Sequence, residues 1–418
     1  MGVADDVAQL AGGDVPLRVT AWDGSAKGPP DSPVTLHVAN ERALSAVMTA
    51  PGDIGLARAY LAGDLELAGV YPGDPYEAMR LLQNWRFRIP VASTLVDLAR
   101  TVGLRGLVSR TRPETEAAPR WRRAVRHHTR ITDARTVRRH YDVSNAFYEL
   151  VLGPSMTYSC AVFEKDDATL EEAQDAKHDL ICRKLGLRPG MRLLDVGSGW
   201  GSMVRHAARH FGVEATGITL SPQQASYARD AVRREGLQDR VRILEIDYRD
   251  LADGPYEAIS SVGMIEHVGI RRYPRYFGVL HDLLAPGGRL LNHGIIRPDS
   301  HASVKPGAFI DRYVFPDGEL PPPERVVGAA HDAGLEVRHV ENLREHYAMT
   351  LRQWGSNLVA GWDDAVRLVG VERARVWGLY MAGSRLSFEE NALQVHQVLA
   401  VRPSPDGASG LPLRPDWA

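Results

Sequence analysis

The stretch Leu193-Leu-Asp-Val-Gly-Ser-Gly-Trp-Gly201 decides the fold of this chain. An apolar run ends at Val196, three glycines follow at alternate positions, and apolar residues then recur at helical spacing from 203 to 208. This order predicts a buried strand, a tight turn and a helix. The glycine spacing is not G-x-G-x-x-G, and no Gly-Lys-Ser/Thr follows, so a phosphate cradle is disfavoured. The stretch is therefore either a simple strand-to-helix turn or the ligand-binding turn of a doubly wound α/β sheet, where glycine admits a ligand close to the backbone.

Length and composition limit the class of protein. The chain has 418 residues, a net charge of −2 and two cysteines, Cys160 and Cys182. This length favours two or three domains, and the small net charge argues against wholesale nucleic-acid binding. Two cysteines make no disulfide framework, which fits a reducing cytosol. Asp5 and Asp6 lie near the start without an apolar segment, and no run of eighteen apolar residues exists, so we expect neither a signal peptide nor a membrane span.

From residue 140 onward, strand patterns alternate with helix patterns, which predicts an α/β fold with a parallel sheet. Residues 285–288, Ala-Pro-Gly-Gly, are typical of a turn into a fifth strand, and the last two strands are expected to form an antiparallel pair. The expected strands are 193–196, 214–218, 241–246, 258–262, 289–292, 335–340 and 394–401, with helices that include 222–235 and 273–284 and an irregular insertion at 316–323.

Two regions precede this part of the chain. Residues 1–97 predict a small α+β domain without a catalytic constellation. Residues 98–139 contain twelve arginines and only three acidic residues. The segment 113–119, which begins and ends with proline, interrupts any helix in this region. This second region is either a solvated helix and linker or a surface attracted to anionic lipid headgroups, where each basic residue contributes about 1 kcal/mol. Nucleic-acid binding is the weaker interpretation because aromatic residues are scarce there.

Several short motifs are spread along the chain from residue 140 to residue 347. They are His140-Tyr-Asp-Val-Ser144, Met156-Thr-Tyr-Ser-Cys-Ala161, the 193–201 stretch, Gly217-Ile-Thr-Leu-Ser-Pro-Gln-Gln224, Gly263-Met-Ile-Glu-His267, Phe309-Ile-Asp-Arg-Tyr-Val-Phe-Pro316 and His346-Tyr347. Taken together they resemble the S-adenosylmethionine (SAM) methyltransferases, and within these the cyclopropane fatty acid and mycolic acid synthases. The resemblance covers residues 140–400 strongly. It implies a Rossmann-like class I SAM methyltransferase domain at 140–418, with a mostly parallel seven-stranded sheet, behind a lipid-binding domain at 1–97 and an Arg-rich linker at 98–139.

The same resemblance implies a SAM site, and it implies no metal. Ordinary Rossmann enzymes use an acidic residue for the ribose, whereas a glutamine would serve here. For Tyr248 the alternative is simple core packing. The implied set is Tyr158 and Ser159 over the methionine end, Gly197, Gly199 and Gly201 beneath it, Thr219, Leu220 and Gln224 at the ribose, Tyr248 and Arg249 at the adenine, and also Asp195 and Val262.

The implied reaction is methyl transfer to the cis double bond of an unsaturated acyl chain. An alkene is a poor nucleophile, but the methyl group leaves a positively charged sulfur, and a carbocation then forms on the chain. That cation must be stabilised and deprotonated, and preorganised charge in a dry site is a large catalytic contribution. The resemblance assigns a bicarbonate ion to this task, held by the backbone N–H groups of Cys160 and Ile295, the side chains of Glu266 and His293, and the hydroxyl of Tyr347.

Two of these residues have other interpretations. Cys160 is otherwise a small buried apolar residue or a nucleophile, although no histidine is adjacent in sequence. Glu266 is otherwise a structural carboxylate.

Position 146 departs from the family pattern, which usually has Asp or Glu where this chain has Ala146. A carboxylate there would lie close in sequence to the segment 158–160 and would serve as a base, with Glu149 as a substitute one helical turn later. The absence of a carboxylate at position 146 predicts normal SAM binding and slow turnover. Ala146→Glu is then expected to raise the rate by roughly 10²–10⁴-fold, the usual contribution of a positioned base.

Two products and one function of another class stay open. Proton loss from the new methyl group closes a cyclopropane, whereas a hydride shift before proton loss gives an exocyclic 10-methylene chain. The residues around 141–145 and 156–163 resemble the actinobacterial branch that makes 10-methylene, later 10-methyl, stearate from oleoyl phospholipid. The expected partners are an anionic phospholipid surface at the inner, cytoplasmic face of the membrane, the acyl chain, a separate reductase and a second copy in a homodimer. The alternative of another class is a lipid-binding protein that has lost catalysis.

Overall fold

The computed structural model describes residues 2–10, 15–50, 52–83, 113, 115–117 and 144–417. The chain divides into two compact units, one of residues 1–120, 307–316 and 354–386, and the other of residues 121–306, 317–353 and 387–418. The predicted boundaries near residues 97 and 139 lie outside the described residues, so the three-part division stays a prediction. Two segments of the C-terminal half nevertheless belong to the same compact unit as the N-terminal residues.

The larger unit is built on a seven-stranded sheet with the order β10-β11-β9-β8-β5-β6-β7. β5 pairs in parallel with both β6 and β8, so the strand order reverses at β5. The antiparallel pairs β9·β11 and β10·β11 close the other edge. The predicted mostly parallel sheet and its terminal antiparallel pair are therefore confirmed. The strands are β5 (Arg192–Val196), β6 (Glu214–Thr219), β7 (Val241–Glu245), β8 (Tyr256–Val262), β9 (Leu284–Ile296), β10 (Glu336–Asn342) and β11 (Gln394–Val401).

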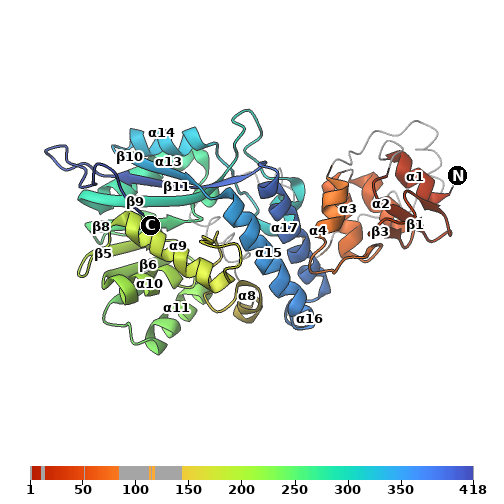
Figure 1. The fold of residues 1–418 in the computed structure, drawn as a ribbon, viewed down its shortest axis with the longest axis horizontal. Helices are drawn as coiled ribbons and strands as arrows, with labels where there is room; N and C mark the ends of the chain where they lie inside the picture. The colour runs from red at the N-terminus through yellow and green to blue at the C-terminus, as the bar shows by residue number, and fades with distance from the viewer. Residues whose placement is uncertain are drawn as a thin grey trace. The chain divides into compact units, whose positions relative to one another are not determined.

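Helices cover both faces of this sheet, with α9, α10 and α11 on one face and α13 and α14 on the other (Figure 1). Leu193 packs among the first group and Leu194 among the second, because successive side chains of a strand point to opposite faces. The helices are α8 (Asn145–Leu152), α9 (Leu170–Leu185), α10 (Ser202–Phe211), α11 (Pro222–Arg234), α12 (Ile265–Val268), α13 (Tyr273–Leu283) and α14 (Pro323–Asp332), with 3-10 turns at Tyr248–Asp250 and Ile270–Arg272.

Local sequence explains how these elements begin. Thr169 and Glu172 form a reciprocal capping box at the start of α9, which satisfies backbone N–H groups that the helix leaves open. Before α10, Gly197, Gly199 and Gly201 have φ angles of +81°, +52° and +80°. Residues with a Cβ rarely adopt such angles, so the alternating glycines meet a backbone requirement of this turn.

The turn predicted at residues 285–288 is wrong. β9 runs without interruption from Leu284 to Ile296, and its pairing with β8 skips from Leu284 to Arg289. The stretch is therefore a bulge inside a strand, a local departure from regular pairing. Gly287 supplies the necessary bend with a φ of +77°.

The smaller unit contains a four-stranded sheet with the order β2-β1-β3-β4. The buried carboxylate of Glu116 accepts hydrogen bonds from Arg58 at 2.7 Å and from Arg312 at 2.6 Å, which joins the 307–316 segment to this unit. The sequence analysis did not predict the helices between 344 and 389. The elements are β1 (Arg18–Ala21), β2 (Ala26–Lys27), β3 (Thr35–Val38), β4 (Leu65–Ala68), α1 (Val3–Leu10), α2 (Glu41–Thr49), α3 (Asp53–Leu61), α4 (Tyr76–Leu82), the π-helical turn Ile310–Val314, α16 (Trp362–Val369), and parts of α15 (Arg344–Ala360) and α17 (Val371–Glu389).

Among the helices of the described residues, none is long and apolar enough to cross a membrane. The arginine-rich region 98–139 lies almost entirely outside the described residues, so its predicted role at a lipid surface stays a prediction.

Candidate active site

A pocket lies beside the 197–201 turn, at the carboxyl ends of β5, β6 and β8, whose last residues line it. In open α/β sheets, ligands bind at this edge, where the strand order reverses. A Cβ added at Gly199 would have no atom within 4 Å, so the backbone there faces open space. A Cβ at Gly197 would lie 2.4 Å from Sδ of Met264. The glycines therefore serve two purposes, since one leaves room for a ligand and the other allows a neighbouring loop to pack.

All the predicted cofactor residues except Gly201 line this pocket. Gly201 instead faces α11, where an added Cβ would lie 3.0 Å from Cβ of Ala228. The lining includes Tyr158, Ser159, Asp195, Gly197, Gly199, Thr219, Leu220, Gln224, Tyr248, Arg249 and Val262.

Polar contacts hold several of these side chains in place. Ser260 donates a hydrogen bond to Asp195 at 2.7 Å, and burial raises the pKa of this carboxyl to about 6. Thr219 Oγ1 donates to Gln224 Oε1 at 2.9 Å. This hydrogen bond fixes the Thr219 and Gln224 side chains relative to each other in the pocket wall.

The position of Tyr248 is compatible with either interpretation made from the sequence. Its ring packs edge-on against Tyr276 at a centroid distance of 5.2 Å, as a core residue would. It also lines the pocket, with the guanidinium of Arg249 5.4 Å from its ring centroid. Arg249 Nε in turn donates to Asp247 at 2.8 Å.

One wall of the pocket comes from α9 and was missed by the sequence analysis. Gln174 Nε2 donates to the carbonyl oxygen of Ser159 at 3.0 Å, and Lys177 Nζ donates to the Ser159 hydroxyl at 3.1 Å. Lys177 is only 2% exposed, and burial lowers the pKa of its ammonium to about 8. The available signal was an ionisable residue one helical turn from Ile181, on the apolar face of an amphipathic helix.

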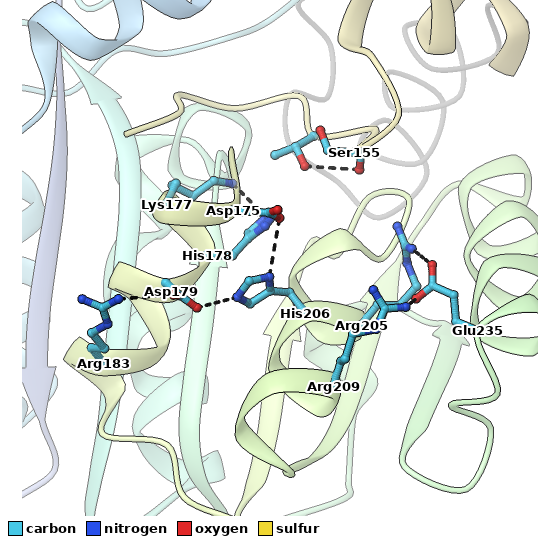
Figure 2. Close-up of polar contacts among 11 residues, drawn as sticks. Ser155, Asp175, Lys177, His178, Asp179, Arg183, Arg205, His206, Arg209 and Glu235 are labelled. Atoms are coloured by element: carbon cyan, nitrogen blue, oxygen red, sulfur yellow. Dashed lines mark hydrogen bonds and ion pairs between the residues drawn. The ribbon is translucent and has the colours of Figure 1, made fainter. Parts of the chain in front are cut away.

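Figure 2 shows that Lys177 also lies in a cluster of polar side chains between α9 and α10 that includes two histidines, His178 and His206. Lys177 Nζ lies 3.1 Å from His178 Nε2, and Asp179 accepts a hydrogen bond from His206 at 2.8 Å. Ligand atoms of Asp175, His178 and His206 lie within 4.8 Å of one another, a set that could surround a metal ion. An ammonium already within hydrogen-bond distance of His178 disfavours a second cation beside it, and we assign no metal to this group.

The residues predicted to hold an anion come together in two groups that do not line the pocket. In the first, Glu266 Oε1 accepts the backbone N–H of Ile295 at 2.6 Å, and His293 is two residues earlier on the same face of β9. In the second, Cys160 Sγ lies 3.7 Å from the carbonyl oxygen of Leu343, which also accepts the N–H of Tyr347 at 3.2 Å. The Ile295 N–H thus bonds a protein carboxylate, not a free anion as predicted, because a buried carboxylate needs a donor.

Two atoms of the first group are buried without a hydrogen-bond partner in the described part of the chain. They are Glu266 Oε2 and His293 Nε2. Burial raises the pKa of Glu266 to about 7 and lowers that of His293 to about 3. Both groups are therefore able to be neutral near pH 7. Unpartnered buried polar atoms are rare in native proteins, so this group is a candidate site for a small polar ligand.

Cys160 is fully buried, and burial raises the pKa of its thiol. A thiolate nucleophile is therefore disfavoured. The two remaining interpretations are a small buried side chain and a backbone donor to an anion.

Ala146 is exposed at the start of α8, whereas Phe147, Tyr148, Val151 and Leu152 are buried. The buried side of this helix faces the pocket, since the ring of Tyr148 is 5.9 Å from that of Tyr158, a pocket residue. Ala146 does not line the pocket, and Glu149, its predicted substitute, is also exposed.

Comparison with known proteins agrees with this geometry. The mycolic acid cyclopropane synthetase family matches residues 128–398. A probable fatty acid methyltransferase of Mycobacterium tuberculosis is 51% identical over 410 residues, which cover 97% of this chain and 96% of that protein. A tuberculostearic acid methyltransferase of the same organism is 33% identical over 417 residues, or 96% of this chain and 92% of that protein. A mycolic acid cyclopropane synthase, crystallised with SAH and CTAB, is 36% identical in sequence. The match covers 64% of this chain and 98% of the crystallised chain, and the two structures superpose with a TM-score of 0.61. The chain therefore belongs to the mycolic acid cyclopropane synthetase family and is a SAM-dependent methyltransferase.

Proposed function

We propose that this chain transfers the methyl group of SAM to the cis double bond of an oleoyl phospholipid and forms a 10-methylene-stearoyl chain, the precursor of 10-methylstearate. The observation that carries this proposal is the extent of the likeness. The tuberculostearic acid methyltransferase matches 96% of this chain, including the N-terminal residues, whereas the crystallised cyclopropane synthase matches 64%. Modification of lipid acyl chains is common to these relatives, and the choice of product is what we propose.

The proposed SAM site is the pocket beside the 197–201 turn. Bound SAM would supply a methyl group on a positively charged sulfur. The open space at Gly199 suits a ligand that lies against the backbone. Gln174 and Lys177 anchor Ser159 through its carbonyl and its hydroxyl, and so hold the segment proposed to close over the methionine end.

The acyl chain would then need a stabilised cation and a base. The alkene electrons would form the bond to the methyl carbon as the methyl–sulfur bond breaks and its electrons stay on the sulfur. A hydride shift would then move the cation to the methyl-bearing carbon, and loss of a proton from the methyl group would leave the methylene. Near pH 7, Glu266 is able to keep its proton and donate it to an anion from Oε2, and a neutral His293 is able to donate from Nε2. Bicarbonate held by these two groups, the N–H of Cys160 and the hydroxyl of Tyr347 would supply the base.

The setting of the reaction is also proposed. The acyl chain is too apolar to reach the site through water, so the enzyme would work at the cytoplasmic face of the membrane. Residues 1–97 would bind lipid, and the arginines of 98–139 would attract anionic headgroups. We further propose a homodimer and a separate reductase that converts the methylene product.

Two alternatives remain as hypotheses. A cyclopropane synthase would lose the proton directly after methyl transfer, without the hydride shift. A lipid-binding protein that has lost catalysis would bind SAM and give no product.

One experiment separates these possibilities. The full chain is incubated with SAM and dioleoyl phospholipid vesicles, and the released fatty acids are examined by mass spectrometry and by proton NMR. Both methylated products gain one CH₂, so NMR must decide between them. We expect signals of an exocyclic methylene; cyclopropane protons would contradict the proposed product, and SAM binding without any mass gain would contradict catalysis.

A further inference from the structure

A line of polar side chains leads from the half-buried Glu341 on β10 through buried residues to His293. Lys184 on α9 has a side chain that is 0% exposed, and it pairs with the carboxylate of Glu341 on β10. Lys184 Nζ also donates to Oε1 of Gln397 on β11 at 2.7 Å. Nε2 of the fully buried Gln397 lies 3.3 Å from Nδ1 of His293 on β9. Three strands and one helix therefore contribute to a continuous hydrogen-bonded line.

The direction of each hydrogen bond in this line follows from Lys184. An ammonium has donors and no acceptor, so Gln397 must present its amide oxygen to Lys184. The amide NH₂ group then faces His293, whose Nδ1 must accept. The antiparallel register places Gln397 directly opposite His293, and turning the amide over would set its NH₂ against the ammonium. Such a reversal would leave buried donors unsatisfied, which is costly.

A neutral imidazole carries one proton, so a ring that accepts at Nδ1 carries it on Nε2. Burial and the positive charges of Lys177 and Lys184 favour the neutral ring of His293. Nε2 is the buried atom without a partner in the described residues, as is Oε2 of Glu266. The line of hydrogen bonds therefore decides whether this side of the ring donates or accepts.

We propose that Gln397 and Lys184 are positioning residues that hold the proton of His293 on Nε2, so that the ring donates a hydrogen bond to a small oxyanion beside Glu266. The inference deepens the proposed function and rests on it for the anion site. Without Gln397, the ring is free to place its proton on Nδ1, and Nε2 then presents a lone pair that repels an anion. Glu341 contributes by keeping Lys184 charged, because an amine without its proton could also accept from Gln397.

The test reads the tautomer directly. Full-length protein labelled with ¹⁵N-histidine is examined by long-range ¹H–¹⁵N correlation, with a His293→Asn sample used only to identify the ring signals. We expect a pyrrole-type shift at Nε2 and a pyridine-type shift at Nδ1. In Gln397→Glu, the carboxylate keeps its pairing with Lys184 but only accepts, so the Nδ1 signal should move to the pyrrole-type position. Gln394→Glu makes the same change on the same strand and should leave both His293 signals in place.

A second variant covers the case in which Gln397→Glu does not fold. In Lys184→Met the side-chain amide of Gln397 is free to turn over. The two ring-nitrogen signals of His293 should then move toward each other as the tautomers exchange. Unchanged His293 signals in a folded Gln397→Glu or Lys184→Met protein would overturn the proposal, as would a parent protein with the proton on Nδ1.

A rate measurement separates this proposal from the proposed function. In Gln397→Leu, the bicarbonate concentration for half-maximal methyl transfer should rise roughly tenfold or more, the effect of losing one hydrogen bond to a charged group. If these substitutions change the His293 tautomer but leave the bicarbonate dependence of the rate unchanged, the positioning role is supported and the bicarbonate site is contradicted. A tautomer that does not respond would contradict the positioning role whatever the rate.

Discussion

Glu266→Gln should change the way in which the stability of the larger unit depends on pH. Burial raises the pKa of Glu266 from its ordinary value of 4.5 to about 7. Between these values the unfolded chain releases the proton while the folded chain keeps it, so stability is present below pH 4.5 and is lost as the pH rises toward 7. A glutamine keeps the acceptor for the Ile295 N–H and has no proton to lose.

The size of the effect follows from the two pKa values. One pKa unit corresponds to about 1.4 kcal/mol, so the full cost of ionisation is about 3 kcal/mol well above pH 7. At pH 5, Glu266 is already ionised in most unfolded chains, and about 1 kcal/mol of the loss of stability is therefore present. The free energy of unfolding of Glu266→Gln, relative to the parent, should therefore rise by about 2–3 kcal/mol between pH 5 and pH 8.

Urea unfolding in bicarbonate-free buffer at pH 5, 6.5 and 8 measures this difference. Because the chain divides into two compact units, pulsed hydrogen exchange of peptides from β8 and β9 is used to follow the transition of the larger unit. Glu324→Gln, at an exposed position in the first turn of α14, controls for the loss of one acidic side chain. Parallel pH profiles of the parent and Glu266→Gln would refute the reasoning, because the carboxyl would then titrate alike in the folded and unfolded chains.

Three further predictions follow from the site and the proposed setting. Gly199→Val should abolish SAM binding measured by calorimetry, whereas Gly236→Val, also at positive φ with no atom near an added Cβ, should not; equal affinities would contradict the pocket assignment. The exposed position of Ala146 on α8 argues against the base that the sequence predicted there, so Ala146→Glu should leave single-turnover methyl transfer unchanged; a gain of roughly 10²–10⁴-fold, the effect of a positioned base, would instead support the sequence prediction. The full chain should sediment with anionic vesicles more than with neutral ones, and salt should weaken the difference; equal sedimentation with both would exclude electrostatic attraction.

The sequence by itself determined the local elements and the family. The strand that ends at Val196, the turn of alternating glycines and the following helix all depend on neighbouring residues, through apolar spacing and the positive φ that glycine allows. The lining residues at the ends of β5, β6 and β8 were predictable because they belong to motifs at the carboxyl ends of strands, which meet at one edge of a parallel sheet. The wall that α9 contributes was not.

The tertiary structure alone decided which distant groups meet. Lys184 and Gln397 are 213 residues apart in sequence, and Gln397 and His293 are 104 residues apart. No local pattern links them, because strand register and burial bring them together and make each depend on the others for its hydrogen bonds. The turn predicted at 285–288 was wrong for a related reason: its proline and glycines favour a turn locally, but β8 pairs with β9 on both sides of them, so that they form a bulge within one strand. Even the state of the His293 ring, a matter of one proton, depends on a lysine that lies in another part of the sequence.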